Sequence, residues 1–400
     1  MNHPPPRSYF LWCAAFFSTL LLGLYLFYIL IMWGPALMGG SAYPVDPRGE
    51  PVGVDFANFY LASRLALSGE PAAVYDRARF DSYRTSFFPL QDREVFPWVY
   101  PPLFLLLMLP LALLPYLAAL GVWQAVSLGL FLGTLRRLAP HPFTLLLALG
   151  FPATFINFFT AQNGFITVFL MGGGLLLLGS RPFLGGLLLG MLVYKPHLGV
   201  LVPVALLAGR GWRALLGAGA SAAALALASL VVLGAETWQA YLSSIPSSVN
   251  LLDSSSLPWK LMPSVFAAAR VAGADPALAR LLHGAVMAGV AAAVVWTWSR
   301  RSSPYLRHSA FVLASLLFTP YLFFYDYVCL ALPLAWLGWE GCQRGFGRGE
   351  KALLAIAWLS PLSMMPFQGV KLPGLICPLV LSALLVLTLL KSRREAPDPG

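Results

Sequence analysis

Long apolar runs dominate the chain and predict transmembrane helices. Tyr9–Trp33, Leu103–Leu109 and Val380–Leu390 hold almost no polar residues, and the first run is about 25 residues long, which suffices to cross a bilayer. Strands of a membrane β-barrel would instead alternate apolar and polar residues. The first run also exceeds the apolar core of a cleavable signal peptide, so we expect it to be retained as a span.

Spans of this kind recur along the whole sequence and bring the expected total to about twelve. The later ones are predicted at 100–135, Phe143–Phe158, Gly164–Gly179, Phe183–Ala208, Ala214–Gly234, Pro276–Ser299, Ser309–Pro320, Tyr327–Trp339, Ala352–Pro366 and Pro373–Leu390. The stretch 100–135 is either one kinked span or a short hairpin turning near Pro115. We favour the single span because it leaves Arg136 and Arg137 on the inner side. Pro196 predicts that Phe183–Ala208 is two short helices.

Two longer polar stretches separate the spans, at 34–100 and 235–275. The first holds eight of the 16 acidic residues: Asp46, Glu50, Asp55, Glu70, Asp76, Asp81, Asp92 and Glu94. Within it, Asp55–Ser68 mixes apolar with polar residues and ends at Gly69, which predicts an amphipathic helix on the membrane surface. A second such helix is expected from about Asp76 to Phe87. The second stretch is expected to pack over the first.

Composition agrees with this pattern. Hydrophobic residues make up 58% of the chain and charged residues 10%, and the mean hydropathy is +0.74. Soluble domains use roughly 45–50% apolar and about 25% charged residues. A cytosolic enzyme, a disulfide-stapled secreted module and a disordered chain are therefore excluded. We predict an all-α integral membrane protein forming one polytopic domain over residues 1–400.

The net charge of +10 is interpreted as a signal of topology. Basic residues cluster at the ends of apolar runs, and no basic run on polar sequence suits nucleic acid. The clusters that fall in inner loops are Arg300, Arg301, Arg307, Arg344, Arg348, Lys351, Lys391, Arg393 and Arg394. The protein is then expected in the inner membrane with both termini on the cytoplasmic side, and 34–100 and 235–275 lie on the outer, periplasmic face.

Four places carry residues that suit chemistry. Asp55 can act as a general base or simply cap its helix, and the two interpretations weigh equally. Lys195 and His197 are ionisable groups inside an apolar run, where the alternative for the lysine is snorkelling to headgroups. Gln162 and Asn163 form a polar turn that either binds sugar hydroxyls or only turns the chain. Asp326 either binds substrate or caps the next span.

Other chemistry finds little support in the sequence. The four cysteines, at 13, 329, 342 and 377, show no paired spacing, and neither a metal-ligand cluster nor a nucleotide-binding loop is evident. We therefore expect any transferred group to come from a lipid-borne donor. His283 has no acidic neighbour in sequence, which disfavours a membrane acyltransferase.

The order of several short motifs resembles glycosyltransferase family 87. They are Asp55-Phe56-x-x-x-Tyr60-x-x-Ser63, Leu67-x-Gly69, Val74-Tyr75-Asp76, Phe96-x-x-x-Tyr100-Pro101-Pro102, Ala161-Gln162-Asn163-Gly164, Gly190-x-x-x-x-Lys195-Pro196 and Thr319-Pro320-Tyr321-x-x-x-Tyr325-Asp326. This family groups C-type (GT-C) polytopic enzymes that use polyprenyl-phosphate sugars, mannosyltransferases among them. Two departures are visible: the family often has glycine where this chain has Ala161, and histidine in the late turn that holds Asp326.

The resemblance implies an inverting transferase with its active site facing away from the cytoplasm. Asp55 would be the base, and the donor phosphate would be met by Lys195, with His197 and Lys260 behind it. The sugar and acceptor would be bound by Asn58, Tyr100, Gln162, Asn163 and Asp326. Trp98, Trp238 and Trp259 would either stack on the sugar or belong to the interfacial aromatic belt.

The expected partners are a polyprenyl-phosphate sugar, a lipid or cell-envelope glycan acceptor, and membrane lipids. No cofactor and no obligatory metal are expected, because a lipid monophosphate offers fewer oxygens to chelate than a pyrophosphate. The alternative is a lipid or solute transporter or flippase, which would move its substrate without bond chemistry and would have no need of a carboxylate at position 55.

Overall fold

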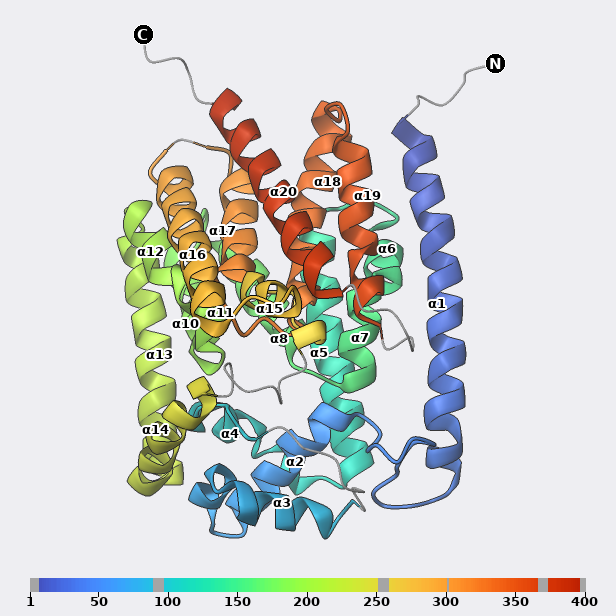
Figure 1. Cartoon of the computed structure of the whole chain (residues 1–400), viewed down its shortest axis with the longest axis vertical. Helices are drawn as coiled ribbons and strands as arrows, with labels where there is room; N and C mark the ends of the chain where they lie inside the picture. Colours follow the sequence, from blue (N-terminus) through green and yellow to red (C-terminus); the bar gives the residue numbers. More distant parts are fainter. Residues whose placement is uncertain (1–6, 89–96, 251–258, 301, 366–372, 396–400) are drawn as a thin grey trace.

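A computed structural model describes residues 7–88, 97–250, 259–300, 302–365 and 373–395. The regular elements of the described residues are helices (Figure 1). The first loop also contains one isolated β-bridge, between Val45 and Pro51. The first part of the chain comprises α1 Arg7–Met38, α2 Val54–Leu67, η1 Pro71–Tyr75, α3 Arg77–Thr85, α4 Pro102–Met108, η2 Leu111–Leu113, α5 Tyr116–Leu138, α6 Thr144–Gly150 and α7 Pro152–Thr160. This part confirms the expected all-α class and the presence of a helix at both places expected in the first loop.

The remaining elements are shorter on average. They are α8 Gly164–Val168, the π-helical turn η3 Phe169–Gly173, α9 Gly174–Leu177, α10 Pro182–Gly190, η4 Met191–Tyr194, α11 Pro196–Gly199, α12 Leu201–Ala208, α13 Trp212–Leu233, α14 Ala235–Asn250, η6 Trp259–Leu261, α15 Val265–Val271, α16 Pro276–Trp298, α17 Pro304–Phe318, η7 Asp326–Leu330, α18 Ala331–Arg344, α19 Glu350–Leu359, η8 Ser360–Met364 and α20 Pro373–Glu395. Asp92 and Glu94 lie outside the described residues.

Five helices of the described part are long and apolar enough to span a membrane. They are Tyr9–Met38, Tyr116–Leu138, Trp212–Leu233, Pro276–Trp298 and Ile376–Glu395. The other apolar stretches consist of shorter pieces, in several cases because a proline starts a new helix, as Pro152 and Pro196 do. These five spans make the protein a helical membrane protein, and the total of about twelve stays a prediction.

The molecule has two distinct ends. In Figure 1, α1 begins, α18 ends and α20 ends at one end, whereas α2, α3 and α14 lie at the other. The end of α16 and the beginning of α17 also lie at the first end, with Arg300 and Arg307 beside them. As expected, α14 packs against the first loop: it contacts η1, and the rings of Tyr75 and Tyr241 lie 5.7 Å apart.

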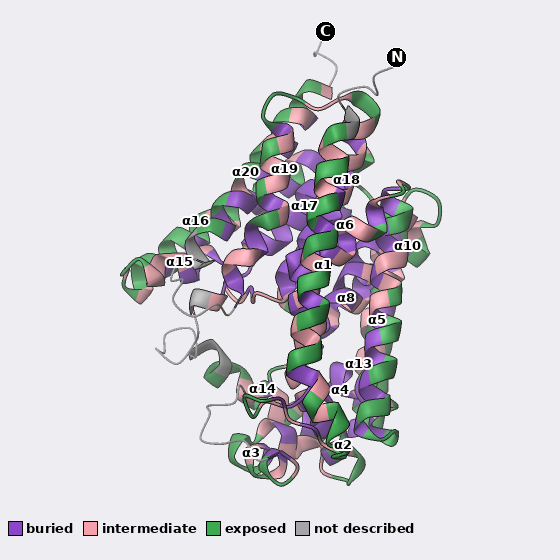
Figure 2. Ribbon diagram, turned by 90° about the vertical axis from the view of Figure 1, so that its right-hand side faces the viewer, coloured by how far each residue is buried: buried purple, intermediate pink, exposed green. Residues whose placement is uncertain are grey.

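Burial follows this arrangement. Figure 2 shows a buried centre around α17 and α8, while the outward side of α1 is exposed. Glycines let α10 lie directly against α13, because a Cβ at Gly186 or Gly190 would meet the backbone of Ala214 or Ala218. Close approach of small residues is how helices pack in lipid, where no hydrophobic force drives them together.

Two expectations about the first half of the chain are wrong. The stretch 100–135 is not one kinked span: α4 ends at Met108, η2 follows, and the span α5 begins at Tyr116 directly after Pro115. A proline ring removes a helical hydrogen bond and clashes with the preceding turn, and two prolines close together stop the helix.

The other correction concerns α2, which is not an amphipathic helix on the membrane surface. Ser63, on the expected polar side, is fully buried, while the apolar Leu67 is 46% exposed. The reason is tertiary: η1, η2, α3, α4, α5 and α7 all contact α2 and cover most of its sides.

Candidate active site

Asp55 lies in the first turn of α2 but does not cap it. The residue before the helix is Gly53, with a left-handed φ of 72°, and no side chain caps the helix start. A Cβ at Gly53 would approach that of Ala161 to 3.2 Å, so this glycine brings the helix start against the turn between α7 and α8. The interpretation of Asp55 as a helix cap is therefore wrong.

The turn at Ala161–Asn163 is held from behind by α5. Trp123 Nε1 donates to the carbonyl of Ala161 at 3.0 Å, and Gln124 Nε2 donates to that of Phe158 at 2.6 Å. Gln162 Oε1 accepts from the backbone N–H of Asn163 at 2.8 Å and from the Tyr100 hydroxyl at 3.3 Å. The turn therefore presents two buried amides, one of them linked to the first loop.

Lys195 reaches this turn from the break between η4 and α11. The residue before a proline is disfavoured in helix, and Lys195, which precedes Pro196, has φ −133° and ψ 68°. Its Nζ donates to Asn163 Oδ1 at 2.6 Å and forms an ion pair with Asp326 of η7. Both side chains of the pair are almost fully buried. The snorkelling interpretation of Lys195 is wrong, because the charge faces a carboxylate inside the protein.

Small and aromatic residues complete this packing. A Cβ at Gly164 would meet Val328 and the Tyr325 carbonyl, so glycine lets α8 lie directly against η7. The Tyr325 ring lies 5.1 Å from Lys195 Nζ. The Tyr194 hydroxyl hydrogen-bonds with Thr167 at 2.5 Å and donates to the Asn163 carbonyl at 3.3 Å. The ion pair is thus enclosed by rigid neighbours.

His197 forms part of the rim of the site. Its side chain is 29% exposed, and its Nε2 lies 3.8 Å from Asp326 Oδ2, beyond hydrogen-bond distance. Within the described residues, His197 Nε2, Asp326 Oδ2 and Asn163 Nδ2 have no hydrogen-bond partner. The site therefore offers unsatisfied polar groups beside a buried ion pair.

The electrostatic environment of Asp55 ties it to the same cluster. Burial raises the pKa of its carboxyl group to about 7, although part of the residue remains exposed. This rise is opposed by side-chain hydrogen bonds from Thr160 and Gln162 and by the positive charge of Lys195. The negative charge of Asp326 adds to the rise. A carboxyl group with a pKa near neutrality suits a general base.

Not all candidates join the cluster. Asn58 Oδ1 accepts from Arg84 Nη1 at 2.7 Å, so its amide binds α3 instead. Trp98 is buried among Phe59, Phe80 and Phe104, as a core residue and not a stacking platform or belt residue. Lys260 lies in η6, but its side chain lies outside the described part.

Two remaining aromatic candidates contact local neighbours. The rings of Trp238 and Tyr241 meet edge to face at 6.0 Å, and the Arg270 guanidinium lies over the ring of Trp259 at 4.4 Å. Thr160 and Tyr194, which sequence reasoning missed, do belong to the cluster. The only signal for them was their adjacency to Gln162 and Lys195 along the chain.

The fold and this cluster define a class: a polytopic helical membrane protein with a polar site built from a carboxylate, two amides and a buried ion pair. A family model described as glycosyltransferase family 87 matches residues 98–320, more than half of the chain. The chain belongs to glycosyltransferase family 87. The matched residues include Tyr100, Gln162, Asn163 and Lys195, whereas Asp55 and Asp326 lie outside them. Comparison with curated proteins and with solved structures found no match.

Proposed function

We propose that this glycosyltransferase moves a sugar from a polyprenyl-phosphate donor to a hydroxyl group of a lipid or glycan acceptor, with Asp55 as general base. The sugar is mannose or another hexose or pentose, and the site faces the periplasmic side of the cell inner membrane. Family membership supports the reaction class over a transporter. The observation that carries the proposal is the meeting of Asp55, Gln162, Asn163, Lys195 and Asp326 from four separate segments.

The reaction is one displacement at the anomeric carbon. Asp55 takes the proton of the acceptor hydroxyl while that oxygen bonds to the anomeric carbon. The bond between this carbon and the phosphate oxygen breaks on the opposite side, and polyprenyl phosphate leaves with the electron pair. A single displacement inverts the anomeric centre. Asp326, the second carboxylate of the cluster, is committed to Lys195, so it is not offered as a covalent nucleophile.

Lys195 is the proposed ligand of the departing phosphate. An ammonium group has three donors, and Asn163 and Asp326 take two of them. The third remains for a phosphate oxygen, whose negative charge grows as the sugar leaves. His197 at the rim, and Lys260, complete the proposed phosphate contacts. Because a monophosphate meets these cations directly, the proposal includes no obligatory metal and no other cofactor.

The unsatisfied polar atoms are proposed to bind sugar and acceptor hydroxyls. Asn163 Nδ2 can donate and Asp326 Oδ2 can accept, and both are buried without a partner among the described residues. Tyr100 and Gln162 are already joined to each other at 3.3 Å and would orient the acceptor beside Asp55. Asn58 is left out of this group, because Arg84 binds its amide oxygen.

The test is transfer of labelled sugar by purified protein reconstituted in vesicles. Polyprenyl-phosphate mannose, glucose, galactose and arabinose are offered to the wild type, Asp55→Asn and the control Glu70→Gln, each with and without chelator. Glu70 is a carboxylate of the same loop that pairs with Arg79 on the surface. We expect wild type and control to consume one donor, and Asp55→Asn to bind it but turn it over about 10²–10⁴-fold more slowly.

Three results would contradict parts of this proposal. If Asp55→Asn turns the donor over as fast as the control does, Asp55 is not the general base. If chelator abolishes activity and a divalent ion restores it, the metal-free mechanism is wrong. Binding of donor lipid with no turnover by any form puts the transport interpretation first.

A further inference from the structure

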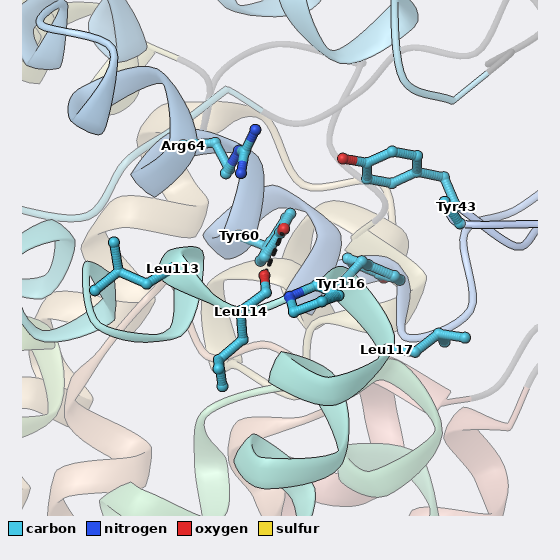
Figure 3. A pocket seen from close by; sticks show the side chains of 9 residues that line it. Tyr43, Tyr60, Arg64, Leu113, Leu114, Tyr116 and Leu117 are labelled. Carbon is cyan, nitrogen blue, oxygen red and sulfur yellow. Dashed lines mark hydrogen bonds between the residues drawn. The ribbon is translucent and has the colours of Figure 1, made fainter.

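A second polar feature of the first loop lies apart from the site around Asp55. A pocket of about 360 Å³ opens where α2 passes the start of α5. It is lined by Tyr43, Tyr60 and Arg64 and, from the junction of η2 and α5, by Leu113, Leu114, Tyr116 and Leu117 (Figure 3). Arg64 follows Asp55 by nine residues, roughly 13 Å along a helix, so the pocket is separate from the transferase site.

The walls of this pocket are fixed by hydrogen bonds to the backbone. The Tyr60 hydroxyl donates to the Leu114 carbonyl at 2.8 Å, and the Tyr116 hydroxyl donates to the Val52 carbonyl at 2.6 Å. These bonds join α2 to the junction between η2 and α5. The pocket is thus preformed and does not depend on a bound molecule to shape it.

Its one charged side chain, Arg64, is positive. Arg64 is exposed and forms no ion pair within the described residues, and none of the residues lining the pocket is acidic. The Tyr60 and Tyr83 hydroxyls lie near its guanidinium: burial raises the pKa of both, and the charge of Arg64 counteracts the rise. The Tyr60 and Tyr83 oxygens accept from Arg64, whereas its positive charge has no acidic partner among the described residues, and such a guanidinium can bind the oxygens of a phosphate.

The apolar half of the pocket points to a lipid. Leu113 is 73% exposed, and Leu114 and Leu117 are each 37% exposed. Leu113 and Leu114 stand just before α5 and Leu117 lies in its first turn, and because the candidate span starts at Tyr116 all three lie where a membrane span meets its interface. Lipid phosphates occupy that depth, with acyl chains running from there along the helix.

We propose that this pocket binds a phospholipid of the adjacent leaflet, its phosphate on Arg64 and its acyl chain along Leu113, Leu114 and Leu117. Such a lipid would join α2 to the start of α5. The site is independent of the proposed transfer reaction, and its test therefore measures binding and not turnover.

The experiment titrates the purified, delipidated protein with phosphatidylglycerol and counts bound lipids by native mass spectrometry. Diacylglycerol has the same tails without phosphate, and glycerol phosphate has the phosphate without tails. We expect phosphatidylglycerol to bind most tightly, Arg64→Gln to weaken it at least about fivefold, and Arg64→Lys to retain most of the affinity. Leu113→Asn should also weaken the binding of phosphatidylglycerol, and because Leu113 is exposed this change leaves the fold intact.

Arg77→Gln is the matched control, since it removes an exposed arginine of the same loop that does not line the pocket. Equal binding by Arg64→Gln and wild type, or equal loss in Arg77→Gln, would overturn the proposal. Binding of glycerol phosphate as tight as that of phosphatidylglycerol would also overturn it, because the site would then hold a soluble phosphate. Melting curves of each variant show that a loss of binding is not a loss of fold.

Discussion

At Asp55, burial and local charge act on one carboxyl group in opposite directions. Burial dominates and raises the pKa to about 7 from the ordinary value of 3.8, while hydrogen bonds and Lys195 pull it down. A general base must be ionised to accept a proton, so with Asp55 as the proposed base we expect activity to fall below this pKa and to level off above it.

The first prediction is therefore a pH profile. The value of kcat/KM should rise tenfold per pH unit below about 7 and level off above it. The measurement is initial rate against pH with limiting donor, using Glu70→Gln as the control that should keep the same profile. A flat profile between about pH 5 and 9 would show that Asp55 does not set the rate.

Stability should respond to the same group with the opposite sign from an ordinary salt-bridged aspartate. The folded pKa lies above the unfolded one, so the contribution to stability is present at low pH and is lost as pH rises toward about 7. At pH 8, Asp55→Asn removes a buried charge and should melt no lower than the wild type. A large drop in melting temperature would mark Asp55 as structural.

Lys195 and Asp326 form a second residue-scale test. Removing one partner of a buried ion pair leaves an uncompensated charge and typically costs about 3–5 kcal/mol, whereas apolar replacement of both is often tolerated. We predict that Lys195→Met and Asp326→Leu each destabilise the fold and that the double variant regains most of the loss. The melting temperatures of the two single variants and the double variant give the coupling free energy between Lys195 and Asp326.

Activity of the double variant separates the two roles of this pair. If Lys195 binds the donor phosphate, the double variant stays inactive although it is folded, and KM for the donor is raised in any residual turnover. Wild-type turnover by the double variant would show that the pair serves structure alone.

At the scale of elements, the α7–α8 turn shows why one departure from the family pattern matters. Ala161 ends α7 in a left-handed conformation, with φ 54° and ψ 41°. An L-residue with a Cβ pays roughly 1 kcal/mol there, whereas glycine does not. The glycine that the family often has at this place thus suits the backbone, and alanine carries strain.

We therefore predict that Ala161→Gly keeps activity and raises the free energy of unfolding by up to about 1 kcal/mol. Ala153→Gly is the control: Ala153 is equally buried but lies inside α7, where glycine should destabilise by about 0.5–1 kcal/mol. Opposite signs in the two melting shifts are the expected result. Destabilisation of the same size by both would show that the turn is not strained.

Elements were foreseen best where backbone chemistry alone decides them. Pro196 broke Phe183–Ala208 as expected, since a proline acts on its own neighbours whatever surrounds it. The amphipathic interpretation of α2 failed because the faces of a helix depend on what covers it. Six other elements cover α2, and none of them lies in its sequence window.

At the scale of the whole molecule, the two ends have different chemistry. Basic residues exceed acidic ones around the ends of α18 and α20, whereas the site-bearing α2 lies at the other end, where the arginines of the first loop are matched by its carboxylates (Figure 1). Basic loops stay in the cytoplasm, so this arrangement predicts an outward-facing site.

Cysteine labelling tests this topology. In a chain whose exposed Cys13 is replaced by Ser, a cysteine at Ala78 in α3 should react with a membrane-impermeant maleimide in intact cells with a permeable outer membrane. A cysteine at Arg348, before α19, should react only after the inner membrane is opened. Both positions are exposed in the protein. Equal labelling of both in intact cells would contradict the orientation.

The sequence by itself determined the class of the protein and the helix break at Pro196, although it left the break before Tyr116 open. Apolar runs, basic clusters and prolines act over a few residues, so their effect can be deduced from the chain alone. Its motifs also pointed to the family that residues 98–320 match. Only the tertiary structure decided which polar residues meet: Asp326 is 131 positions from Lys195 and neutralises it, while Asn58, three residues from Asp55, binds Arg84 instead. Such pairings arise from the packing of distant helices, which no local pattern encodes.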